Sequence, residues 1–188
     1  MPEVKEIENK SKVKTINIVN IKNEKPKLHT TKPLLIEEND HILLNGESGS
    51  GKTTLLYLLK GIVKPKVLEI EPAIELINSQ TYLTLPNHKS LYSGNLYDII
   101  TNYDKNSNVE LIEYSLQASK IAHRLNSNEF VDIETLSGGE RIRLLIARII
   151  YAVKTKNYNV LLFDEIDENL NDKLAVEVCT NLRDIFKD

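Results

Sequence analysis

The sequence predicts an α/β fold, because short apolar runs typical of strands alternate along the chain with segments of helical periodicity. The run NVLLF (159–163) indicates a buried strand, and it precedes a segment with apolar residues at helical spacing (172–186). The run HILLN (41–45) leads through a glycine-rich loop into the helical pattern KTTLLYLLK (52–60). Strands that alternate with helices in this way favour a parallel central sheet.

The N-terminal part predicts further short strands. Residues 16–21 alternate between apolar and polar side chains, which is typical of a strand, and the polar stretch 22–33 predicts a loop. In the next segment, EEND (37–40) predicts a turn between a short strand, LLI, and the strand at 41–45. Gly61 follows the predicted helix at the position where a helix end favours positive φ.

The middle of the chain has weaker periodicity. The runs KVLEIEP (66–72) and IELIN (74–78) are candidate strands, with proline residues between the segments. Residues 107–125 predict a helix, because Ser107 and Glu110 have the spacing of a capping box and apolar residues recur on one helical face.

Length and composition fit one globular domain without an obvious charged partner. The 188 residues carry 24 Lys and Arg against 27 Asp and Glu, so no basic surface for nucleic acid is expected. The single cysteine, Cys179, excludes an internal disulfide and a cysteine-based zinc site. We expect neither a secretory signal at the N-terminus nor a membrane span, so a membrane role would come through a partner.

The stretch GESGSGKT (46–53), hereafter the phosphate loop, matches the pattern G-x-x-x-x-G-K-[ST] between a predicted strand and a predicted helix. Backbone N–H groups of such a loop surround phosphate oxygens, and the helix start adds its positive dipole end. Lys52 is expected to contact the β and γ phosphates, and the Thr53 hydroxyl to bind Mg²⁺. The candidate nucleotide-binding residues here are Gly46, Ser48, Gly49, Ser50, Gly51, Lys52, Thr53 and Thr54.

Two carboxylates, Asp164 and Glu165, follow the predicted strand 159–163, at the sheet edge where α/β proteins bind ligands. Asp164 is expected to hold Mg²⁺ directly or through water, and Glu165 to orient or deprotonate the attacking water. An acidic pair in isolation is more often a solvated strand end. Its combination with the phosphate loop favours the catalytic interpretation.

A second glycine-rich segment, LSGGE (136–140), precedes a long apolar helical pattern. Ser137 and Glu140 have capping-box spacing, so a helix is predicted to begin at Ser137 beside Gly138 and Gly139. Exposed N–H groups at such a start can attract an anion, although a well-capped helix that binds nothing is the alternative. One possible anion is a nucleotide γ-phosphate held by another molecule.

The phosphate loop, LSGGE and LLFDE stand in an order that resembles the ATP-binding-cassette (ABC) ATPases over residues 13–186. The resemblance implies a P-loop NTPase fold with a mainly parallel central sheet, reduced N-terminal antiparallel strands and a small helical lobe. It also implies a single domain, with a nucleotide-binding core at 13–80 and 132–188 and the helical lobe at 81–131. The expected cofactors are ATP and Mg²⁺.

The same resemblance implies partners and one more site residue. Two cassettes of this family dimerise head to tail, so Ser137, Gly138 and Gly139 would contact the ATP of a second cassette. Gln80 resembles the glutamine that reaches Mg²⁺ and the attacking water, which makes it a catalytic and metal candidate. The segment LYSGNLYDII (91–100) resembles an exporter segment that approaches transmembrane domains. We therefore expect transmembrane partners and a location at the cytoplasmic face of a membrane.

The sequence departs from the family pattern in two places. Residues 1–56 contain no Phe, Tyr or Trp to stack on adenine, and His29 is the substitute candidate, so we do not expect strong base selectivity. The family places a switch histidine on a strand after the last helix, and the sequence ends at Asp188 before that strand. The resemblance implies a Mg-dependent ATPase, and the missing histidine leaves open whether this 188-residue form hydrolyses ATP at the usual rate, slowly or not at all.

Two alternative functions remain open. One is a soluble ABC ATPase of the DNA-repair or chromosome-maintenance kind, which is disfavoured because no sustained heptads separate Lys52 from Ser137. The other is a regulatory module that binds ATP with little hydrolysis, which the missing histidine favours. ATP hydrolysis that energises a membrane transporter is the leading hypothesis.

Overall fold

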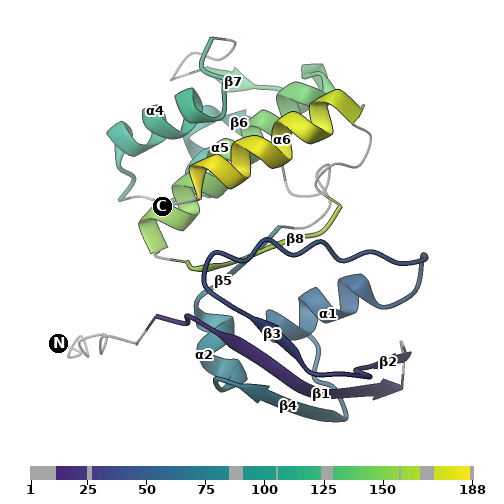
Figure 1. Cartoon of the computed structure of the whole chain (residues 1–188). Helices are drawn as coiled ribbons and strands as arrows, with labels where there is room; N and C mark the ends of the chain where they lie inside the picture. The colour runs from purple at the N-terminus through teal and green to yellow at the C-terminus, as the bar shows by residue number, and fades with distance from the viewer. Residues whose placement is uncertain are drawn as a thin grey trace, which may run out of the picture. The chain divides into compact units, whose positions relative to one another are not determined.

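The computed structural model describes residues 12–24, 27–84, 91–104, 106–123, 129–156, 158–165 and 172–186. The chain divides into two compact units (Figure 1). The first comprises Met1–Tyr82 and Asn159–Leu161, and the second Leu83–Tyr158 and Leu162–Asp188. The division into a nucleotide-binding core and a helical lobe stays a prediction.

The first unit contains an antiparallel sheet in which β1 pairs with three other strands (Figure 1). Ile16, Ile18 and Ile21 of β1 are at most 4% exposed, so the alternation seen in the sequence marks the core face of this strand. The small N-terminal antiparallel sheet is therefore confirmed, with β2 formed inside the stretch predicted as a loop. The four strands are β1 (Ile16–Glu24), β2 (Lys27–His29), β3 (Leu34–Ile36) and β4 (Val67–Glu71).

Two helices, α1 (Lys52–Leu59) and α2 (Ile74–Ser79), contact each other in this unit. α1 confirms the helix predicted after the phosphate loop, and Gly61 beyond it has φ 76° as expected. α2 corrects the strand predicted at 74–78. Ile77 is fully buried and lies one helical turn from Ile74, so the same apolar residues form a short helical face.

The segment 41–45 does not form the predicted strand. The turn before it is present, since the Asp40 N–H donates to the Glu37 carbonyl at 3.1 Å. An extended segment becomes a strand only when a neighbour accepts its backbone hydrogen bonds, and no described strand pairs with this one. Ile42 and Leu43 accordingly stay 46% and 89% exposed.

The strands β5 (Thr81–Thr84) and β8 (Val160–Phe163) pair with each other, and β8 confirms the strand predicted at 159–163. The Val160 N–H donates to the Gln80 carbonyl, and the Asp164 N–H donates to the Thr84 carbonyl, both at 3.1 Å. The register advances in the same direction on both strands, so the pair is parallel. Antiparallel strands, a parallel pair and helices together confirm the α/β fold class.

Most of the second unit packs around one long helix, α5 (Gly138–Lys156), which α3, α4 and α6 all contact (Figure 1). Its buried side chains include Ile142, Leu145, Ile146 and Ile149, at most 1% exposed. The surrounding elements are β6 (Gly94–Asn95), α3 (Leu96–Thr101), α4 (Val109–Ala118), β7 (Phe130–Val131), a 3₁₀ helix (Ile133–Thr135) and α6 (Asp172–Ile185).

The start of α4 differs by one residue from the prediction. Asn108, rather than Ser107, is the N-cap, and its Oδ1 accepts from the Leu111 N–H at 3.0 Å. The helix ends at Ala118, and Lys120 follows with φ 60°. Residues 119–123 were predicted to continue the helix and do not, so that part of the prediction is wrong. Residues 124 and 125 lie outside the described ranges.

Within the described ranges, no helix combines the length and the apolar character needed to cross a membrane.

Candidate functional site

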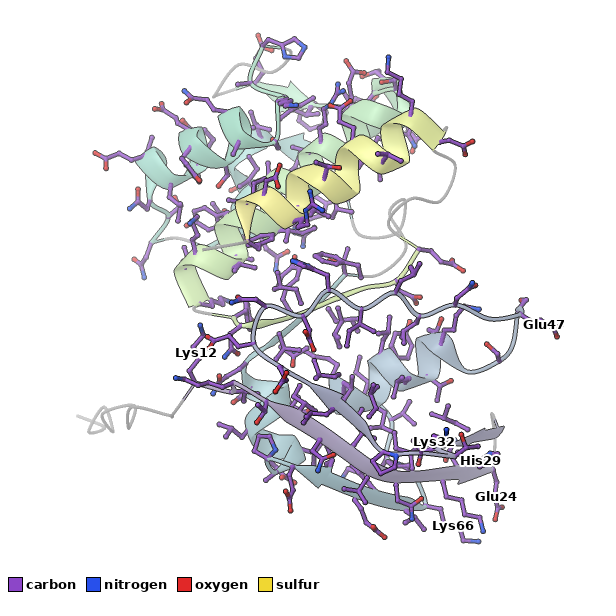
Figure 2. All side chains as sticks on the ribbon, in the orientation of Figure 1. Lys12, Glu24, His29, Lys32, Glu47 and Lys66 are labelled. Atoms are coloured by element: carbon purple, nitrogen blue, oxygen red, sulfur yellow. The ribbon has the colours of Figure 1, made fainter. Side chains whose placement is uncertain are left out.

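The phosphate loop of the first unit forms a tight turn that depends on glycine. The Ser50 N–H donates to the Glu47 carbonyl at 3.2 Å, and Glu47 lies at the outer tip of the loop (Figure 2). Gly49 and Gly51 have φ of 78° and 99°, in the left-handed region that a side chain disfavours. The glycine pattern in the sequence therefore corresponds to a real backbone requirement.

Lys52 folds back across the phosphate loop. Its Nζ donates to the Gly46 carbonyl at 2.7 Å and to the Glu47 carbonyl at 2.9 Å. Both partners are neutral oxygens of the loop itself, so they hold the ammonium over the loop without neutralising its charge. Phosphate oxygens would replace these carbonyls as stronger, charged acceptors.

The start of α1 carries no side-chain cap. Gly51 is the N-cap residue, and no acidic residue occupies the first turn, which holds the half-buried Thr53 and Thr54. The positive end of the helix dipole is therefore opposed by no carboxylate of its own first turn. Loop and helix together present N–H groups and a cation to an incoming anion.

Buried leucines and one lysine anchor α1. Leu58 and Leu59 are 1% and 4% exposed, and they hold one face of the helix in the core. The Lys60 Nζ at its C-terminus donates to the Thr81 carbonyl at 2.6 Å and the Asn78 carbonyl at 3.3 Å. Burial lowers the pKa of the Lys60 ammonium. These contacts anchor α1, which begins where the phosphate loop ends.

The acidic pair belongs to the second unit, where it directly follows β8. Asp164 is 6% exposed, and its N–H donates to the Thr84 carbonyl at the end of β5. Glu165 is exposed and has φ 49°, an uncommon backbone conformation for a residue with a side chain. The chain thus turns sharply between one buried and one exposed carboxylate, and such outliers cluster at functional sites.

Gln80 holds the N-terminal end of the described chain. Its Oε1 accepts from the Val13 N–H at 2.9 Å, while the Asn159 Nδ2 donates to the Val13 carbonyl at 2.7 Å. Val13 is 7% exposed, so both of its backbone polar groups are satisfied by side chains in a nearly buried position. The sequence motif did not predict this anchor, because it joins residues far apart in the chain.

The predicted capping box at the start of α5 is confirmed. The Ser137 N–H and the Ser137 hydroxyl each donate to Glu140 Oε2 at 2.8 Å, and the Glu140 N–H donates to Ser137 Oγ at 3.3 Å. The Arg141 Nε donates to the Leu136 carbonyl at 3.1 Å, which also fixes the approach to the helix. Gly138 and Gly139 complete this start, with Gly138 exposed.

The segment 91–100 is joined to α5 by contacts that sequence reasoning missed. The Tyr92 and Tyr103 rings stack with centroids 5.4 Å apart, and the Arg148 guanidinium lies 5.9 Å from the Tyr92 ring. Arg148 Nη2 also donates to Asn102 Oδ1 at 2.9 Å. Burial raises the pKa of Tyr92. In the sequence, these contacts were indicated by no more than the position of Arg148 within the apolar helical pattern after LSGGE.

Comparison with known proteins identifies the family. A family model described as "ABC transporter" matches residues 33–168. An ABC transporter ATP-binding protein/permease of Acanthamoeba polyphaga mimivirus is 30% identical over 170 residues, which cover 81% of this chain and 30% of that protein. The molybdate/tungstate import ATP-binding protein of Methanocaldococcus jannaschii is 26% identical over 162 residues, 79% of this chain and 51% of that protein.

The fold agrees with solved structures. The cbiO1 protein of Clostridium perfringens, part of the transporter complex cbiONQ, superimposes with a TM-score of 0.72 at 18% identity, over 94% of this chain and 75% of that one. The chain spans about a third to a half of the two curated relatives described above. The family match covers most of the chain, and it contains the phosphate loop, the start of α5 and the acidic pair. This protein therefore belongs to the ABC transporter family and carries its ATP-binding, P-loop NTPase fold.

Proposed function

We propose that this chain binds MgATP and hydrolyses it at the interface of a head-to-tail dimer with a second ABC cassette, and so energises a membrane transporter. The observation that carries the proposal is the Lys52 Nζ, held over the phosphate loop by two neutral carbonyls at the uncapped start of α1. Relatives that are import ATP-binding proteins support the link to transport. Transmembrane partners and a place at the cytoplasmic face of a membrane belong to this proposal.

The phosphate loop would hold the nucleotide. Backbone N–H groups of residues 46–51, with Gly46, Ser48, Gly49, Ser50 and Gly51 as the candidates, would surround the phosphate oxygens. Lys52 would contact the β and γ phosphates, and the Thr54 hydroxyl would add a phosphate contact. The positive φ of Gly49 and Gly51 supports this role, because it turns the backbone tightly before α1.

The candidate magnesium donors are all oxygen atoms. They are the Thr53 hydroxyl, the Asp164 carboxylate and the Gln80 carboxamide, and Mg²⁺ prefers such hard ligands together with phosphates and waters. When bound, Mg²⁺ neutralises charge that develops on the β and γ phosphates. Gln80 would have to exchange its bond to Val13 for this role.

Glu165 is the proposed catalytic base. Its exposed carboxylate follows the buried Asp164 and can accept a proton from an attacking water. Ser137, Gly138 and Gly139 would contact the nucleotide of the partner cassette from the start of α5.

The test compares two variants with one control. Lys52→Ala should weaken MgATP binding about 100-fold, as expected for the loss of charge-assisted hydrogen bonds. Glu165→Gln should keep binding and lower phosphate release by about 10²- to 10⁴-fold. Lys32→Ala, which removes an exposed lysine outside the loop, should change neither quantity. Calorimetry measures binding, and a phosphate assay measures turnover.

Each result separates the hypotheses. Unchanged binding in Lys52→Ala would remove the phosphate loop from the nucleotide site. Unchanged turnover in Glu165→Gln would remove Glu165 from the base role. Tight ATP binding with no phosphate release by the unaltered chain would favour the regulatory module over the ATPase.

A further inference from the structure

The Ser137 side chain, which the proposed function directs at a partner's nucleotide, is already bonded to an anion of its own chain. Both the N–H and the hydroxyl of Ser137 donate to the same atom, Glu140 Oε2, at 2.8 Å. The Glu140 N–H returns a bond to Ser137 Oγ at 3.3 Å. The carboxylate therefore occupies two donors at the start of α5.

This anion lies where the helix would attract a phosphate. The N-terminal end of a helix is positively polarised, and a carboxylate in the first turn is stabilised there for the same reason as a phosphate oxygen. The Ser137 donors cannot serve both anions at once, and two anions side by side repel each other. Glu140 and an incoming phosphate therefore compete for Ser137.

We propose that Glu140 is an intramolecular competitor for the start of α5, which sets the MgATP concentration at which two chains associate. The inference rests on the proposed head-to-tail dimer. The phosphate of a nucleotide on a second copy of this chain reaches Ser137 only after Glu140 Oε2 releases it. Glu140 thereby raises the nucleotide concentration needed for the dimer.

Substitution of Glu140 by glutamine tests the charge of this residue separately from its hydrogen bond. A capping box accepts Glu or Gln, so Glu140→Gln keeps an oxygen acceptor for Ser137 and removes the negative charge. Glu134, which is 83% exposed in its side chain and bonds to Arg141, offers a matched control nearby. Glu134→Gln makes the same change in net charge outside the capping box.

The experiment measures dimer formation by sedimentation velocity against MgATP concentration, with Glu165→Gln in every chain to prevent turnover. Adding Glu140→Gln should lower the half-maximal MgATP concentration about fivefold, the size of a favourable charge effect at a helix start. Adding Glu134→Gln should shift it by less than about twofold, as for an exposed charge. Adding Ser137→Ala should abolish or strongly weaken the dimer. Calorimetry on dilute single chains should give equal MgATP affinity for the parent chain, Glu140→Gln and Glu134→Gln.

Two outcomes would overturn the inference while the dimer stands. One is a Glu140→Gln midpoint equal to or above that of the parent chain. The other is an equal shift in Glu134→Gln, which would indicate a general charge effect. If every variant binds MgATP and none dimerises at saturation, the head-to-tail proposal fails and the inference fails with it.

Discussion

The two glycine-rich helix starts of this chain differ in what occupies their N–H groups. Before α1, Gly51 supplies no side-chain cap, and the nearby Lys52 bonds to two neutral loop carbonyls. Before α5, Ser137 and Glu140 close a capping box in which the Glu140 carboxylate accepts two hydrogen bonds. One start therefore offers its positive end to an external anion, whereas the other already holds an internal one.

Glycine content alone does not distinguish these two sites. A helix start without an internal anion can take up phosphate directly, whereas an internal anion has to be displaced first. A start that contributes to folding satisfies the same donors with its own side chains. The residues already bonded within the chain are therefore the ones to test for a structural role.

Among the substitutions that test a structural role, we expect Gln80→Ala to have the largest effect on the free energy of unfolding. Gln80→Ala removes the acceptor for the nearly buried Val13 N–H and should lower the free energy of unfolding by about 1–3 kcal/mol. Gln80→Glu keeps an oxygen acceptor and should retain most of that stability. Thermal unfolding measures both variants, with phosphate release measured in parallel. Slower turnover in Gln80→Ala at unchanged stability would contradict the structural role and support the magnesium role.

Gly51 and Gly138, at the starts of α1 and α5, should differ in how a substitution by alanine changes stability. Gly51→Ala places a side chain at φ 99° and should destabilise the fold by about 1–2 kcal/mol. Gly138 lies at the start of α5, where an added Cβ would meet no atom within 4 Å. Gly138→Ala should therefore leave the free energy of unfolding unchanged or raise it by about 0.5 kcal/mol. Urea unfolding measures both. Equal effects would mean that the two starts share one backbone requirement.

Local signals account for the elements that the sequence predicted correctly. The alternation in β1, the apolar run of β8 and the capping box of α5 each lie within a few consecutive residues, and all are present in the structure. The phosphate loop was recognisable for the same reason. The acidic pair directly after β8, read together with the phosphate loop, also suggested roles for Asp164 and Glu165. Only the family resemblance suggested a role for Gln80.

The predictions of secondary structure were wrong where two local signals were equally strong. Contacts were missed where the two residues lie far apart in the sequence. Residues 74–78 suit a strand or a short helix equally, and the burial of Ile77 selected the helix α2. Ser107 and Asn108 are both good caps, and the structure uses Asn108. The bond from Val13 to Gln80 links residues 67 positions apart, so no sequence window contains it.

The smallest expected effect compares two serine hydroxyls at the two starts. Ser137→Ala removes one arm of the capping box and should lower the free energy of unfolding by about 1 kcal/mol. Ser50→Ala removes an exposed hydroxyl from the phosphate loop, where the N-cap residue Gly51 has no side chain to cap the helix. Its free energy of unfolding should stay within about 0.5 kcal/mol of that of the parent. Urea unfolding of both variants without nucleotide measures the difference. If Ser50→Ala lost as much stability as Ser137→Ala, the phosphate loop would also be using its side chains for folding, and the contrast between an open and a closed helix start would fail.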